Sequence, residues 1–123
     1  MTIACMQKEV PPFHYMIGLA GGDTIRCAPY QTFATKELSI VAVEALKDRK
    51  ACLLANHGQI ALGSNLKQAL SMAMEVETLC DVYWRTLVAG GPTILDKNQM
   101  DEALEKFNKG YGSAKAFVSS ESK

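Results

Sequence analysis

The sequence predicts an α/β fold with three layers, in which helices cover both faces of a largely antiparallel sheet. The first observation is a compact apolar segment at residues 51–55, followed after a short break by residues 59–62, a pattern typical of a β-hairpin. The second is an amphipathic segment from residue 65 to about residue 88, which is long enough to lie against one face of that sheet. With 123 residues, the chain is one domain or part of one.

The N-terminal part of the chain predicts short elements joined by turns. Residues 1–9 resemble the last turns of a helix, and two consecutive prolines then impose extended backbone. The apolar run at residues 13–20 predicts a buried strand. Residues 24–28 alternate like a short strand that the next proline ends.

Three helices are predicted from cap residues followed by apolar residues at helical spacing. Thr35 caps the first, which ends near residues 48–50 and repeats apolar residues at Leu38, Ala42, Ala45 and Leu46. Ser64 and Asn65 cap the second, with Gln68 at the third helical position in a capping-box arrangement. Its apolar stripe is Leu66, Leu70, Ala73, Val76, Cys80, Tyr83 and Leu87. Asp96 caps the last, whose apolar face is Met100, Ala103, Leu104 and Phe107.

The sequence predicts one folded unit with a short tail. Residues 1–112 are expected to form the folded part, which here is a partial domain, and residues 113–123 form a small, polar and mobile tail. The sequence contains no repeat, low-complexity tract or linker that would divide it further.

Composition excludes several classes of partner. Thirteen basic and thirteen acidic side chains balance, so nothing favours nucleic acid or an anionic membrane as a partner. No apolar run approaches a membrane span, and the N-terminus lacks the layout of a signal peptide. The cysteines lack a CxxC pair and favour free thiols in a reducing, cytoplasmic compartment over a disulfide framework: Cys5, Cys27, Cys52 and Cys80.

Two side chains are candidates for chemistry. His57 follows an apolar strand and precedes Gly58, whose freedom to turn sharply would project the imidazole from a rigid edge as a metal ligand or general base. Tyr15 follows two prolines, and its phenol could donate a proton. The alternatives are a turn histidine bonded to backbone and an aromatic core anchor. His14 would face away from Tyr15 on a strand and is interpreted as structural.

Several motifs in the right order resemble the class II aldolase/adducin family, and within it the L-fuculose-phosphate aldolases. They are Pro-Pro-Phe-His-Tyr-Met-Ile at residues 11–17, Ala-Gly-Gly-Asp at 20–23, Ala-Pro-Tyr-Gln-Thr-Phe at 28–33, Thr-Lys-Glu-Leu at 35–38 and Leu-Leu-Ala-Asn-His-Gly at 53–58. The resemblance covers nearly the whole chain. It implies the class II aldolase-like fold.

The resemblance also implies roles for individual residues. The family holds a divalent metal, usually zinc, with three histidines near a glutamate, and His57 matches the last histidine. Tyr15 matches a proton donor on the aldehyde side that a neighbouring subunit supplies, and Tyr111 matches a C-terminal tyrosine that reaches into the site. Phe33 and Phe107 match the wall near the apolar end of the aldehyde. The implied substrate is a phosphorylated ketose or small aldehyde, and the implied assembly is a homo-oligomer, a tetramer in the family.

The sequence also departs from the family pattern. The family's glutamate and His-x-His pair lie upstream of the segment that begins here at Met1, so the chain is expected to be the C-terminal half of the domain with an incomplete metal site. Ala34 stands where the family usually has glycine, and Gly110 resembles an insertion before Tyr111.

Three functions therefore stay open. The first is a zinc-dependent sugar-phosphate aldolase or lyase, of which this chain is a partial sequence with impaired activity. The second is a catalytically inactive truncated homologue. The third is an adducin-type structural or interaction module without metal. An uncovered sheet edge and apolar faces would favour self-association in each case.

Overall fold

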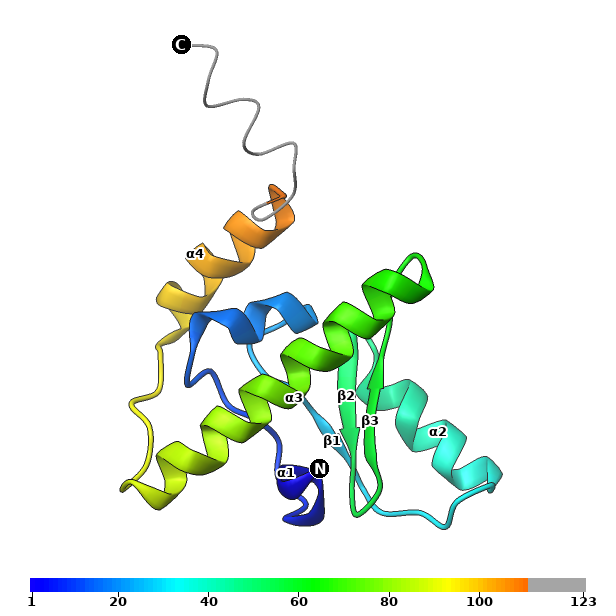
Figure 1. Ribbon diagram of the computed structural model, residues 1–123. Helices are drawn as coiled ribbons and strands as arrows, with labels where there is room; N and C mark the ends of the chain where they lie inside the picture. The colour runs from blue at the N-terminus through cyan, green and yellow to red at the C-terminus, as the bar shows by residue number, and fades with distance from the viewer. Residues whose placement is uncertain (111–123) are drawn as a thin grey trace.

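A computed structural model describes residues 1–110 of the chain, so Tyr111 and the expected tail lie outside the described residues. The elements follow in the order α1 (Thr2–Cys5), the 3₁₀ helix η1 (Tyr15–Ala20), β1 (Cys27–Ala28), α2 (Lys36–Ala45), β2 (Ala51–Leu54), β3 (Gly58–Ala61), α3 (Leu66–Val88) and α4 (Lys97–Asn108) (Figure 1). Within residues 1–110, no helix combines the length and the apolar character that crossing a membrane requires.

The three strands form a small mixed sheet in the order β1-β2-β3. β2 and β3 form the predicted antiparallel hairpin, with four residue pairs from Ala51↔Ala61 to Leu54↔Gly58. β1 pairs with β2 in parallel over two residues, and an isolated antiparallel bridge joins Val10 to Ile25. Most of the paired residues are therefore antiparallel, as predicted.

The central strand β2 separates two hydrophobic clusters, which gives the predicted three layers. All four of its residues are buried. Ala51 and Leu53 join a core with residues of α3, whereas Cys52 and Leu54 pack with residues of α2. Because side chains alternate along a strand, a strand buried on both faces needs cover on both sides, and α2 and α3 supply it (Figure 1).

The predicted caps are present. The Thr35 hydroxyl accepts from the Leu38 amide at 3.2 Å, and the Asn65 side chain accepts from the Gln68 amide at 2.9 Å. The side-chain oxygen of Gln68, however, accepts from the backbone amide of Ser64 rather than from that of Asn65, so the capping box is displaced by one residue. At α4, the box is complete: Asp96 and Gln99 each accept from the other's amide.

The predicted strand at residues 13–20 is wrong, since most of this segment is η1. His14 caps it, because its Nδ1 accepts from the Met16 amide at 3.1 Å. The segment buries Ile17, Gly18 and Ala20 through helical turns instead of pairing with a neighbouring strand. A short apolar run is compatible with either structure, so the apolar pattern alone did not decide between them.

Two other expectations need correction. α2 ends at Ala45, a few residues before the predicted end. On α3, Leu66 and Leu70 are 89% and 63% exposed, so the predicted apolar stripe is buried only farther along the helix. The reason is length: the 23 residues of α3 span about 35 Å, whereas strands of four residues span only about 13 Å.

Candidate active site

A cavity of about 300 Å³ lies between η1 and α4 and contains two of the predicted site residues. Tyr15 is 48% exposed, and its ring lies 6.4 Å from that of Phe107 with an interplanar angle of 20°. Ala103 lines the same cavity, and polar side chains complete it: Gln99, Glu102 and Lys106. The cavity therefore combines an apolar wall with an accessible phenol.

The local sequence fixes both walls of this cavity. The prolines lead into η1, and the Pro12 carbonyl accepts from the Leu95 amide at 2.9 Å, which ties the segment before α4 to the segment before η1. Met100 of α4 and Ile17 of η1 are fully buried in one core with Tyr83 of α3. Because both elements share this core, Tyr15 and Phe107 are held at a defined separation.

His14 lies beside Tyr15 and does not face away from it, contrary to prediction. Their rings stack with centroids 4.8 Å apart and an interplanar angle of 27°. The prediction assumed a strand, and the 3₁₀ turn removes the alternation on which it depended. His14 is nevertheless structural, since its Nδ1 caps η1.

The His57 turn lies elsewhere in the chain. His57 is exposed, and its amide donates to the Leu54 carbonyl at 3.0 Å. The left-handed residue of the turn is Asn56, with φ 55°, and not Gly58, where an added Cβ would meet no atom within 4 Å. The predicted reason for the sharp turn was therefore wrong.

Asn56 ties this turn to α1 and the residues after it. Its amide donates to the Ala4 carbonyl at 2.9 Å, and its side-chain oxygen accepts from the Gln7 amide group at 2.7 Å. Gln7 is also left-handed, with φ 53°. The turn that carries His57 is thus supported by a side-chain bond between two unusual backbone positions.

The described residues do not form a metal site by themselves. Within residues 1–110, no group of three or more histidine, cysteine, aspartate or glutamate side chains could hold an ion. His57 offers a single imidazole, whereas zinc in proteins normally has three or four protein ligands.

The predicted site residues do not all meet within one chain. Phe33 is 74% exposed and lies in the connection between β1 and α2. Figure 1 shows the turn between β2 and β3 at the lower end, next to α1, whereas η1 and α4 lie toward the upper left. The structure therefore joins Tyr15 with Phe107 and leaves His57 outside their cavity.

Sequence reasoning missed the polar members of the cavity. Gln99, Glu102 and Lys106 lie on α4 with the spacing of one helical face, as do Ala103 and Phe107. That spacing was available in the sequence. What was not available was the position of η1 opposite this face.

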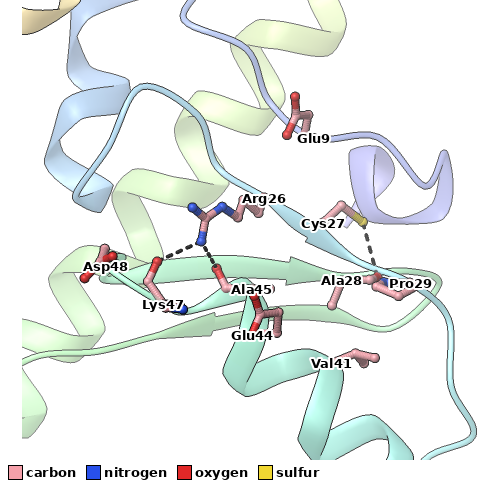
Figure 2. Close-up of a pocket in the computed structure, with 10 residues that line it drawn as sticks. All are labelled: Glu9, Arg26, Cys27, Ala28, Pro29, Val41, Glu44, Ala45, Lys47 and Asp48. Atoms are coloured by element: carbon pink, nitrogen blue, oxygen red, sulfur yellow. Dashed lines mark hydrogen bonds between the residues drawn. The ribbon is translucent and has the colours of Figure 1, made fainter.

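A second hollow, of about 620 Å³, lies between β1 and α2 (Figure 2). Arg26 extends along it and donates through Nη1 to the carbonyls of Lys47 at 2.7 Å and Ala45 at 3.5 Å, at the C-terminal end of α2. Burial raises the pKa of the Cys27 thiol beside it. The remaining lining mixes both charges with apolar atoms, and none of the predicted site residues contributes: Glu9, Ala28, Pro29, Val41, Glu44 and Asp48.

Comparison with known proteins shows consistent similarities. Residues 1–84 match the family described as "Class II Aldolase and Adducin N-terminal domain". The chain is 51% identical over 111 residues to the 5-methylthioribulose-1-phosphate/5-deoxyribulose-1-phosphate aldolase of Rhodospirillum rubrum, and 47% identical over 112 residues to the L-fuculose phosphate aldolase of Escherichia coli. These alignments cover 90% of this chain but 50% and 52% of the relatives, so the chain spans about half their length.

A solved structure gives the same result for the fold. An L-fuculose 1-phosphate aldolase superposes with a TM-score of 0.82 at 39% identity, and covers 87% of this chain and 50% of that one. The predicted three-layer fold and the predicted resemblance are both confirmed by these matches.

Proposed function

The chain belongs to the class II aldolase and adducin family, and on that premise we propose that it serves in the retro-aldol cleavage of a phosphorylated ketose. The observation that carries the proposal is the cavity in which the accessible phenol of Tyr15 faces the ring of Phe107. The relatives named above are aldolases of such sugar phosphates, which supports the reaction class.

Tyr15 acts on the aldehyde side of the reaction. In the direction of condensation, its hydroxyl donates a proton to the aldehyde oxygen as the carbon–carbon bond forms, and in cleavage the same oxygen accepts that proton back. Its ring is held between His14 and Phe107 while about half of the residue is open to solvent. This combination lets a substrate reach the phenol without loss of its orientation.

The apolar wall receives the end of the aldehyde that carries no phosphate. Phe107 and Ala103 supply this wall. The Rhodospirillum relative is named for ketose phosphates that end in a methylthio or a methyl group, and such an end fits a wall of this kind. Phe33, which lies outside this cavity, would line the same substrate only from another copy of the chain.

His57 is proposed as one ligand of a divalent metal, in the first place zinc. When bound, such an ion supplies Lewis-acid activation of the substrate oxygens. The described residues do not complete its coordination, so no step of the reaction is derived through it. Since the His57 turn and the Tyr15 cavity lie apart in one chain, a site that includes both requires a homo-oligomer, such as the family's tetramer. Tyr111, which lies outside the described residues, is proposed to contribute to the same site.

A second candidate is a metal-free module of the adducin type or an inactive homologue. The specific observation in its favour is that residues 1–110 bring no three metal-ligating side chains together. In this case Tyr15 and Phe107 are packing residues, and His57 is a turn residue bonded through its backbone.

The two candidates are distinguished by a variant that removes only the phenolic oxygen of Tyr15. The purified chain is incubated with zinc and 5-deoxyribulose 1-phosphate, and dihydroxyacetone phosphate is measured. Tyr15→Phe is expected to lower the rate by about 10²- to 10⁴-fold, the contribution typical of a positioned acid–base group. Tyr30→Phe is the matched control, because Tyr30 is also about half exposed and lies outside the cavity.

Metal analysis gives an independent result. About one zinc per chain that is lost in His57→Ala supports the first candidate. A folded chain that retains no zinc and forms no product contradicts the aldolase proposal and favours the second candidate.

A further inference from the structure

The ring of Phe107 separates two cavities. On one side lies the Tyr15 cavity, and on the other lies a hollow of about 550 Å³ between η1, α4 and the residues before β2. Phe107 lines both, whereas Tyr15 lines only the first and Gly18 only the second. The position of this ring therefore decides how the space is divided between them.

Gly18 sets the position of the ring. A Cβ built on Gly18 would lie 2.9 Å from Cδ2 and 3.0 Å from Cε2 of Phe107, and 3.3 Å from Cδ2 of Leu104. Contacts this short do not persist between carbon atoms, whose favourable separation is about 3.5–4.0 Å. Phe107 can lie where it does only because residue 18 has no side chain.

The backbone gives no other reason for glycine at this position. Gly18 does not adopt positive φ, unlike the glycines at the ends of the neighbouring elements. It is buried within η1 between Ile17 and Ala20, both of which are fixed in the core. When a methyl group is added, η1 is held in place by this packing, so the ring on α4 must move away from Gly18, toward Tyr15.

We propose that Gly18 is a specificity-determining residue, which fixes the depth of the Tyr15 cavity through Phe107 and so selects ketose phosphates with a larger apolar terminal group. This inference rests on the proposed function. It adds to it a reason why a methylthio-sized end is accepted as well as a methyl end. Gly18 makes no contact with substrate in this scheme, and acts only through the ring.

The test compares two substrates that differ in that terminal group. The ratio of kcat/KM for 5-methylthioribulose 1-phosphate to that for 5-deoxyribulose 1-phosphate is measured for the wild type and for Gly18→Ala. We expect Gly18→Ala to lower the ratio about tenfold, the size of effect that a small volume change in an apolar pocket produces. Adding Phe107→Leu to Gly18→Ala should restore the ratio, because the smaller side chain relieves the contact.

Folding is controlled in the same set of variants. Gly58→Ala adds a methyl group that meets no atom within 4 Å, so its thermal unfolding reports the cost of alanine at an unobstructed glycine. An unchanged ratio in Gly18→Ala, or an equal loss for both substrates that the Phe107→Leu addition does not repair, overturns the proposal.

A binding measurement separates this inference from the proposed function. Aromatic NMR signals of Tyr15 and Phe107 are followed during titration with 2-(methylthio)ethanol and with ethanol. Larger shifts with the methylthio compound in the wild type, lost in Gly18→Ala, support the role of Gly18 even when the chain cleaves neither substrate. The same response in both proteins, or none in either, refutes it.

Discussion

Asn56 offers the sharpest test of how the turn that carries His57 is held. Its side chain accepts a hydrogen bond from Gln7 at an exposed site, a contact that contributes about 0.5 kcal/mol. Its φ of 55° is left-handed, a conformation that costs alanine about 1–2 kcal/mol and glycine nothing. Asn56→Ala should therefore destabilise the chain by about 2 kcal/mol, and Asn56→Gly by about 1 kcal/mol, half of it from the greater freedom of the unfolded chain.

Urea unfolding measures both values, provided that the slope of the transition stays the same in all variants. Gln7→Ala is the matched control, because its backbone stays left-handed and only the hydrogen bond is lost. The double variant of Gln7→Ala with Asn56→Gly should then cost less than the sum of the two. Equal destabilisation by Asn56→Ala and Asn56→Gly would show that the left-handed backbone plays no part, and would refute the reasoning.

Three further predictions concern stability. Ala34→Gly should stabilise the chain by about 0.5 kcal/mol, since Ala34 has φ 61° and glycine removes more strain than its flexibility costs, and the urea midpoint should rise. Asp96→Ala should cost about 1 kcal/mol by removing the capping box with Gln99, seen as a lower melting temperature, and an unchanged value would contradict the box. Burial raises the pKa of Cys52 and of Cys80 to about 11, so the folded chain holds these protons more tightly than the unfolded one. The free energy of unfolding should therefore fall as pH rises from about 9 to 11. Replacing both cysteines by alanine should reduce this dependence on pH.

Local chemistry made much of the fold predictable. The caps at Thr35, Asn65 and Asp96 all accept the hydrogen bonds expected of them, because a cap is decided by residues only three positions apart. The hairpin at residues 51–62 is predictable for a similar reason, since its strands are adjacent in sequence. Long-range packing decided the exceptions, such as the exposed start of α3, which extends past the sheet.

The sequence offered two of the residues that line the cavity as candidates, but neither their arrangement nor the polar residues beside them. Tyr15 was a candidate from its place after two prolines and from the resemblance, and Phe107 from the resemblance alone. Their meeting depends on the shared core of η1 and α4, which no spacing in the sequence encodes. The prediction that His14 faces away from Tyr15 was wrong because it assumed a strand where the chain forms a 3₁₀ helix. The contact between Gly18 and Phe107 was not predictable, because a glycine in an apolar run carries no local signal of what it faces.

The separation of the His57 turn from the Tyr15 cavity leads to a last prediction. The turn is anchored to α1, whereas the cavity is built by η1 and α4, and Figure 1 shows α1 and α4 in different parts of the structure. If the proposed site takes His57 from one copy and Tyr15 from another, then Tyr15→Phe and His57→Ala, each inactive alone, restore activity when mixed and allowed to exchange subunits. Random pairing leaves both residues intact in about one quarter of the sites, so about a quarter of the wild-type rate is expected. A mixture that has exchanged subunits and is still as inactive as its components would contradict the shared arrangement.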